Sequence, residues 1–123
     1  MADEVIKESE IRIKIGLNEE KMPVALTWES DDDPQSKTPQ PCKGMLLSLF
    51  SARHKETLKI DLWTKDMQVL EMDRFFYQTL RGLADTYFRA TQNKQVAEDM
   101  QRFVQYFGEQ TGAVPKDKDG KIK

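Results

Sequence analysis

The stretch from Thr57 to Thr91 changes its hydrophobic period midway, and this change constrains the fold that the chain can adopt. From Leu58 to Leu62, apolar and polar residues alternate with period two, which is typical of a β-strand. After Gln68 the apolar residues recur every three or four positions, so they lie on one face of a helix. The stretch therefore predicts a strand that leads into a long helix with this apolar stripe: Met72, Phe76, Leu80, Leu83 and Tyr87.

Three further strands are predicted before this one. The runs Ile11–Leu17 and Met22–Glu29 both alternate, and the polar turn between them predicts a β-hairpin with matched apolar faces. The third strand, Gly44–Phe50, carries apolar residues on both of its faces. A polar turn then leads into the fourth strand, Thr57–Trp63, where Trp63 shares a face with two charged residues.

The segment Asp31–Pro41 separates the second predicted strand from the third. It contains three prolines and three aspartates. Because proline cannot donate a hydrogen bond and like charges repel, we expect a mobile loop without any regular element.

Two helices are predicted in the second half of the chain. The first spans Val69–Thr91, with Thr64 and Asp66 as candidate N-caps. Asn93 is the expected N-cap of the second helix, because asparagine can accept a hydrogen bond from a free backbone N–H there. That helix carries one apolar stripe, formed by Val96, Met100, Phe103, Val104 and Phe107. It is expected to end at Gly108 or Gly112.

The order of elements is thus β-β-β-β-α-α, which predicts the α+β class. We expect one four-stranded antiparallel sheet, followed by two C-terminal helices packed on one of its faces. Residues 9–112 would form a single α+β domain, with the loop 31–41 on its surface. Residues 1–8 would be a flexible N-terminus and residues 113–123 a flexible polar tail.

Composition narrows the classes of function. The net charge is −2 and the isoelectric point about 5.5. Neither value indicates a basic face, so we expect no nucleic-acid partner. Cys42 is the only cysteine, so an internal disulfide cannot form. The sequence shows no signal peptide and no long apolar run, so we expect no membrane-spanning segment and a cytoplasmic location.

Catalytic chemistry has few candidate residues. His54 is the only histidine and lies in a predicted charged turn. The triplet Asp31–Asp33 lacks a partner ligand for a metal ion. Asp117–Gly120 is similar to the start of a calcium-binding loop, but it lies too near the end of the chain for the acidic residue that closes such a loop. An enzyme using Asp61, Glu29 or Glu71 as acid and base is an alternative that no pairing of carboxylates supports. We therefore expect a protein that is not an enzyme, with no catalytic, cofactor-binding or metal-binding residues and no cofactor.

The second apolar face of the third and fourth strands is the most informative surface. Leu46, Phe50 and Trp63 would point away from the helices, with Lys59 and Asp61 beside them. The sheet could curl to cover them, or residues 1–6 could fold across. The functional alternative is a protein-interaction surface formed by these five residues, through which we expect a homo-oligomer, first of all a homodimer.

The run Ile60-Asp61-Leu62-Trp63-Thr64-Lys65-Asp66-Met67 is highly specific, and it is supported by Leu26–Trp28, Met45–Ser48, Phe75–Leu80 and Phe88–Gln92. In these segments the chain resembles the GldC family of gliding-motility-associated proteins, over about Ser9 to Phe107. The resemblance implies a small cytoplasmic accessory protein of bacterial gliding motility, with a protein partner in the gliding machinery. It brings no catalytic residues that could be carried over to this chain.

Two functional hypotheses follow. The first is a noncatalytic protein-interaction protein that supports gliding motility. The second is a holdase chaperone similar to SecB, because four antiparallel strands followed by two helices is also the element order of that export chaperone.

Overall fold

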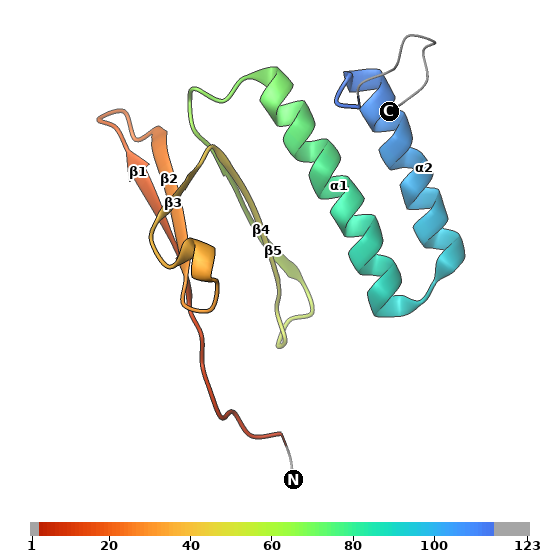
Figure 1. Ribbon diagram of the computed structural model, residues 1–123, viewed down its shortest axis with the longest axis horizontal. Coiled ribbons are helices and arrows are strands. Elements are labelled where there is room, and N and C mark those ends of the chain that lie inside the picture. Colours follow the sequence, from red (N-terminus) through yellow and green to blue (C-terminus); the bar gives the residue numbers. More distant parts are fainter. Residues whose placement is uncertain (1–2, 115–123) are drawn as a thin grey trace. The chain divides into compact units, whose positions relative to one another are not determined.

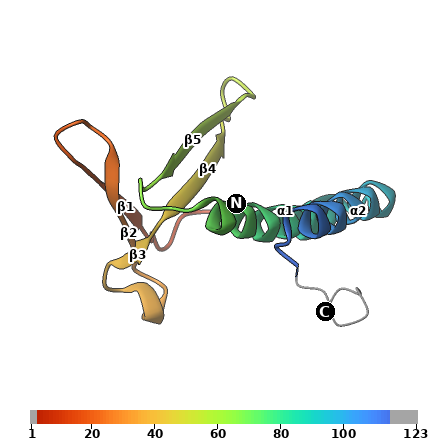
Figure 2. The same ribbon diagram turned by 90° about the horizontal axis from the view of Figure 1, so that it is seen from above.

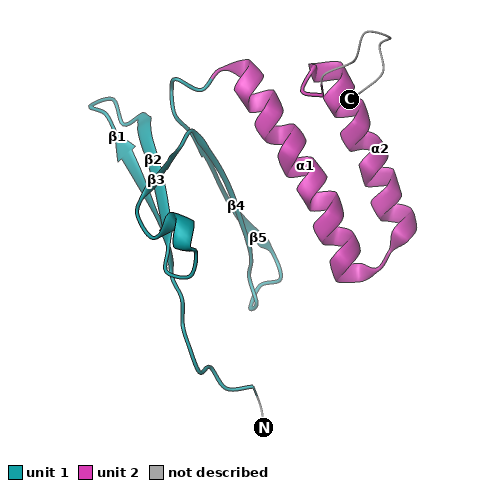
Figure 3. Ribbon diagram, viewed as in Figure 1, with its two compact units in different colours: residues 1–67 teal, residues 68–123 magenta. Residues whose placement is uncertain are grey.

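The structure is a computed structural model that describes residues 3–114. It consists of two compact units, residues 1–67 with the strands and residues 68–123 with the helices (Figure 3). The α+β class is confirmed, because antiparallel strands precede two helices. The packing of the helices on a sheet and the single domain over residues 9–112 stay predictions.

The first unit contains five strands in two sheets (Figures 1 and 2). The expected single sheet of four strands is therefore wrong. Antiparallel pairing gives one sheet with the order β1-β2-β3 and a second sheet that consists of β4 and β5. The strands are β1 (Ile11–Leu17), β2 (Pro23–Ser30), β3 (Gln40–Cys42), β4 (Gly44–Phe50) and β5 (Thr57–Trp63).

The segment 31–41 accounts for this difference, because it contains regular structure. A 3-10 helix, η1, spans Pro34–Ser36, and Asp33 caps it by accepting a hydrogen bond from the backbone N–H of Gln35 at 2.9 Å. The strand β3 begins at Gln40 and includes Pro41, whose missing N–H is tolerated on an edge strand. Proline here starts a helix and occupies a sheet edge, so its presence did not exclude either element. The mobility of this segment stays a prediction.

The β1–β2 hairpin forms as predicted and supplies the apolar face of the first sheet. Ile13 pairs with Trp28 and Ile15 with Leu26, so these four side chains lie on the same face. Cys42 of β3 pairs with Leu26 from the other side. Leu26, at the centre of this group, is only 2% exposed. It is thus the main core residue of the first unit.

The second unit is a helical hairpin of α1 (Val69–Thr91) and α2 (Lys94–Thr111), with the predicted bounds of α1. Asn93 caps α2 as predicted, accepting a hydrogen bond from the N–H of Val96 at 3.2 Å. Gly112 follows the last turn with a φ of 78°, which glycine adopts without strain. The expected N-caps of α1, Thr64 and Asp66, are wrong.

The N-cap of α1 is Gln68 instead. Its backbone N–H donates to Oε1 of Glu71 at 3.0 Å, so the carboxylate of the first turn satisfies a free donor and also sits at the positive end of the helix. Thr64 and Asp66 lie too early in the chain to do this, because five residues separate Trp63, the last residue of β5, from Val69, the first residue of α1.

Small residues form the contact between the two helices. Ala84 is 0% exposed, and Ala97, Val104 and Gly108 of α2 are also buried. Large members of the predicted stripes are more exposed, Phe76 at 38% among them. Val104 belongs to the predicted stripe of α2, whereas Ala84 and Ala97 lie outside both predicted stripes and were not predicted to be buried.

Gly108 has a particular role in this contact. A Cβ atom at Gly108 would lie 2.7 Å from Cε1 of Tyr77 and closer still to the side chain of Val114. Val114 is buried, and its N–H donates to the carbonyl of Gly108 at 3.2 Å, so the chain folds back over α2 at the first residues of the predicted tail. Residues 115–123 of that tail lie outside the described residues.

We predict that Gly108→Ala lowers the free energy of unfolding by about 1–3 kcal/mol, despite the better helix propensity of alanine, because the methyl group has no space. The matched control is Gly82→Ala, where nothing lies within 4 Å of the added carbon. That substitution should raise the free energy by up to about 1 kcal/mol. Urea unfolding followed by circular dichroism checks both, and equal effects of the two substitutions would contradict the contact.

The turn after β5 anchors the end of the β4–β5 hairpin. Thr64 is buried, and its N–H donates to the carbonyl of Lys43 at 2.8 Å. Its hydroxyl donates to Oδ1 of Asp66 at 2.5 Å. This hydrogen bond, followed by the charge of Lys43, lowers the pKa of Asp66 below its ordinary value. The turn is thus tied to the hairpin partly through an ionised carboxylate.

This pKa shift predicts a contribution to acid sensitivity. Because the pKa of Asp66 is lower in the folded state, its stabilising effect is present above about pH 4 and is lost as the pH falls through the folded pKa. We expect Asp66→Asn to reduce the slope of stability against pH below about pH 4. Thr64→Val, which removes the donor but keeps the shape, should reduce it as well. Unfolding midpoints measured between pH 2 and 7 test this, and unchanged acid slopes in both variants would disprove it.

Candidate interaction surface on the β4–β5 hairpin

The hairpin formed by β4 and β5 pairs along its whole length, from Gly44 opposite Trp63 to Phe50 opposite Thr57. Opposite residues in an antiparallel pair share a face, so the register defines both faces of the hairpin. The uniformly apolar face carries Met45, Leu47, Leu49, Leu58, Ile60 and Leu62.

The other face carries all five residues that the sequence predicted as an interaction surface. Leu46 lies opposite Asp61, and the pair of Ser48 and Lys59 separates Leu46 from Phe50. Phe50 is 68% exposed and Trp63 52%, whereas Leu46 is half-buried. The register thus brings Leu46 and Trp63 to one end of this face and leaves Phe50 at the other. Their role in a protein contact stays a prediction.

The two charged residues of this face bind each other. Nζ of Lys59 lies 3.2 Å from Oδ1 of Asp61, two residues along the same strand. Both side chains are well exposed, so the pair stabilises the isolated chain by no more than about 1 kcal/mol. Its structural importance is that the face carries one positive and one negative charge at fixed positions.

A pocket lies beside the Trp63 end of the hairpin. Its volume is about 200 Å³, and mostly apolar side chains line it. It forms because the start of β2 approaches the end of β5, where the N–H of Lys65 donates to the carbonyl of Pro23 at 3.1 Å. This pocket was not predictable from the sequence, since local periodicity does not show which distant strands meet. The lining residues are Met22, Pro23, Asp61, Leu62, Trp63 and Lys65.

A second pocket contains the single cysteine. It has a volume of about 230 Å³ and lies where Gly44 and Met45 meet the apolar face of the first sheet, beside Ile11, Ile13 and Trp28. Burial raises the pKa of the Cys42 thiol above its ordinary value. The thiol therefore remains protonated at neutral pH, which makes it a weak nucleophile.

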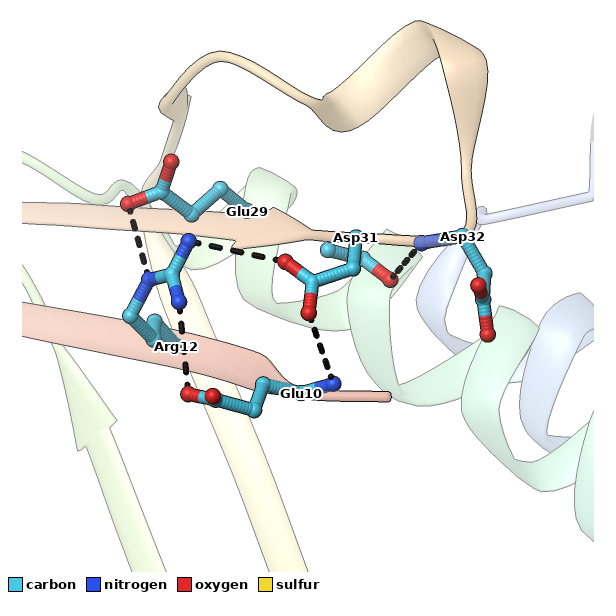
Figure 4. A network of polar contacts seen from close by, with 6 residues as sticks. Glu10, Arg12, Glu29, Asp31 and Asp32 are labelled. Atoms are coloured by element: carbon cyan, nitrogen blue, oxygen red, sulfur yellow. Dashed lines mark hydrogen bonds and ion pairs between the residues drawn. The ribbon is translucent and has the colours of Figure 1, made fainter. Parts of the chain in front are cut away.

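The acidic segment that the sequence offered as a weak metal candidate has structural partners instead. Arg12 of β1 lies 3.4 Å from Oε1 of Glu29 and 3.6 Å from Oδ1 of Asp31, and it also contacts Glu10 (Figure 4). The hydrogen bond with Glu29 is the main cause that raises the pKa of Arg12. Asp32 binds Nζ of Lys7 at 3.2 Å. These charges hold the open end of the β1–β2 hairpin together.

The remaining candidates for chemistry have different structural partners. His54 lies in the turn between β4 and β5, where its backbone N–H donates to Oγ of Ser51 at 3.0 Å. The three carboxylates considered as acid and base have different partners: Asp61 binds Lys59, Glu29 binds Arg12, and Glu71 caps α1. Within residues 3–114 no three His, Cys, Asp or Glu side chains are grouped so that they could hold a metal ion. Asp117–Gly120 lies outside the described residues.

Neither of the two described helices is both long and apolar enough to span a bilayer. Comparison with curated proteins and with solved structures finds no match.

A protein-family model does match. It is described as gliding motility-associated protein GldC-like and covers residues 23–113, well over half of the chain. The matched region includes β2, both strands of the β4–β5 hairpin and both helices. The family predicted from the residues Ile60–Met67 and the segments around them is confirmed: this chain belongs to the GldC-like family of gliding motility-associated proteins.

Proposed function

We propose that this protein is a noncatalytic, cytoplasmic accessory protein of bacterial gliding motility, which acts by binding another protein of the gliding machinery. Membership of the GldC-like family supports the association with gliding motility. The binding surface is the face of the β4–β5 hairpin that carries Leu46, Phe50 and Trp63.

The observation that supports this proposal best is the exposure of two aromatic side chains on one sheet face. Phe50 and Trp63 each gain about 1.5–3 kcal/mol when they are fully buried. Aromatic residues are enriched among the residues that dominate binding energy at protein interfaces. Trp63 also borders the 200 Å³ pocket, which offers space for an apolar side chain of the partner.

The charges beside the aromatic residues add selectivity. Lys59 and Asp61 lie between Phe50 and Trp63 along the hairpin and keep their contact with water. A partner with opposite charges at matching positions would gain two ion pairs at the edge of an apolar contact, while a mismatched protein would be repelled. This arrangement requires no cofactor.

We predict that Trp63→Glu abolishes capture of the partner from extracts of a gliding bacterium and impairs gliding in cells that carry it. The matched control is Leu49→Glu, because Leu49 is also 52% exposed but lies on the opposite face of the same hairpin. Circular dichroism must first show that both variants fold. Capture of the same protein by wild type and Leu49→Glu, with its loss in Trp63→Glu, supports the proposal. Equal capture by all three overturns it.

A SecB-like holdase is the second candidate, favoured by a specific observation. Large apolar side chains are exposed on both faces of the β4–β5 hairpin and on both helices, among them Leu58, Ile60, Leu83 and Phe103. A holdase would bind many unfolded chains, so it would suppress aggregation of an unrelated denatured protein and bind an apolar dye. A protein that binds one specific partner would do neither at comparable concentrations.

A further inference from the structure

The outer edge of β5 has no strand beside it among the described residues, since the second sheet consists of β4 and β5 alone. The ladder between the two strands shows which backbone groups are free. The N–H of Ser51 bonds to Glu56 and that of Thr64 to Lys43, both at 2.8 Å. Bonded pairs recur at every second residue, so Leu58, Ile60 and Leu62 bond inward to β4.

The N–H and C=O groups of Lys59 and Asp61 therefore point outward, away from β4. The same alternation predicts an outward N–H at Lys65, and that group donates to Pro23 of β2. This contact closes the edge beyond Trp63, and Met22 and Pro23 border Asp61 in the pocket described above. No described strand pairs with the backbone of residues 57–61, so it presents a strand edge that is a template for pairing with another strand.

The sequence of this edge is complementary to itself. It reads Leu58-Lys59-Ile60-Asp61-Leu62. When two copies pair antiparallel about Ile60, each Lys59 lies opposite an Asp61 of the other copy, and each Leu58 lies opposite a Leu62. The outward-pointing groups of residues 59 and 61 then meet in hydrogen-bonded pairs, as an antiparallel ladder requires. Apolar residues meet on one face and opposite charges on the other.

Neighbouring registers are unfavourable. A shift of one residue would place outward-pointing groups opposite inward-pointing ones and would break the ladder. In the next registers that keep the ladder, Lys59 lies opposite Lys59 or Asp61 lies opposite Asp61. Like charges directly opposite each other are destabilising. The charges thus select one register among those that the backbone allows.

The other strand edges lack this property. Along β1, Arg12 and Lys14 are both positive, so any antiparallel pairing of β1 with itself brings like charges close together. The strand β4, from Gly44 to Phe50, carries no charge that could select a register. The edge strand β3, Gln40–Cys42, also carries no charge, so among the described strands β5 alone combines an unpaired edge with charges that complement themselves.

We infer that two copies of this protein form a two-fold symmetric dimer by edge-to-edge pairing of β5, which creates a continuous sheet in the order β4-β5-β5-β4. In the separate chain Lys59 and Asp61 bind each other at 3.2 Å, and in the dimer each binds its counterpart across the two-fold axis. The contact moves from the hairpin face, where the sequence placed it, to the hairpin edge. The formation of this dimer does not depend on the proposed partner protein.

The dimer would also enlarge the proposed binding face. Because edge pairing uses neither face of the hairpin, Leu46, Phe50 and Trp63 of both copies would line the same side of one four-stranded sheet. Two binding faces joined in this way can engage a repeated or symmetric partner with higher avidity than one.

Charge reversal tests the register. Lys59→Glu makes the edge fully acidic and Asp61→Lys makes it fully basic, so each should weaken the dimer about ten- to thirtyfold in sedimentation at micromolar concentration. Mixing the two variants should restore a dimer, because the acidic and basic edges complement each other. The double variant with Lys59→Asp and Asp61→Lys should restore it as well. A monomeric wild type, or a dimer indifferent to the single reversals, would overturn the inference.

Cysteine cross-linking supplies a second measurement. In a Cys42→Ser background, Ile60→Cys places two thiols across the axis with Cα atoms about 4.5 Å apart, close enough for a disulfide. Leu58→Cys and Leu62→Cys leave like thiols about 13 Å apart, so each should cross-link only when the two are mixed. Efficient disulfide formation by the Ile60→Cys variant without mixing supports the edge pairing. Failure at Ile60, as in a dimer formed through the opposite face, overturns it.

Discussion

A pair of β-strands with apolar residues on both faces is not stable in water by itself, and the β4–β5 hairpin of this protein has that composition. One face carries six aliphatic residues, and the other carries Leu46, Phe50 and Trp63 around a single ion pair. The local structure secures one end of the hairpin, through the buried Thr64 and the contact of Lys65 with β2. Further stabilisation has to come from surfaces packed against its faces and its edge, and the proposed contacts with other molecules arise from this requirement.

Charged residues in this chain act mainly on its architecture. Arg12 connects β1 to the end of β2 through carboxylates, Glu71 completes the first turn of α1, and Asp66 holds the turn that leads out of the hairpin. Each of these carboxylates has a nearby donor. The exposed apolar side chains of the β4–β5 hairpin are then the chemically distinctive surface of the first unit.

Local signals made much of the fold predictable. The bounds of α1, β4 and β5 followed from periodicity and from the polar turns beside them, and Asn93 and Gly112 marked the ends of α2 through well-known capping chemistry. The errors came from residues with more than one structural use. Prolines that suggested a loop instead start η1 and lie in β3, and Gln68 caps a helix although threonine and aspartate stood nearby. The pocket beside Trp63 depends on a meeting of β2 and β5 that local sequence does not encode.

One further consequence follows from the way β3 passes into β4. Only Lys43 separates the two strands, so a single run of chain from Gln40 to Phe50 pairs first with β2 and then with β5. The register of one sheet is therefore transmitted to the other, and a slip of one residue in either would misalign both. Both sheets should open as one cooperative segment, so that Gln40 and Cys42 of β3 exchange their amide hydrogens as slowly as the longer strand that they continue into.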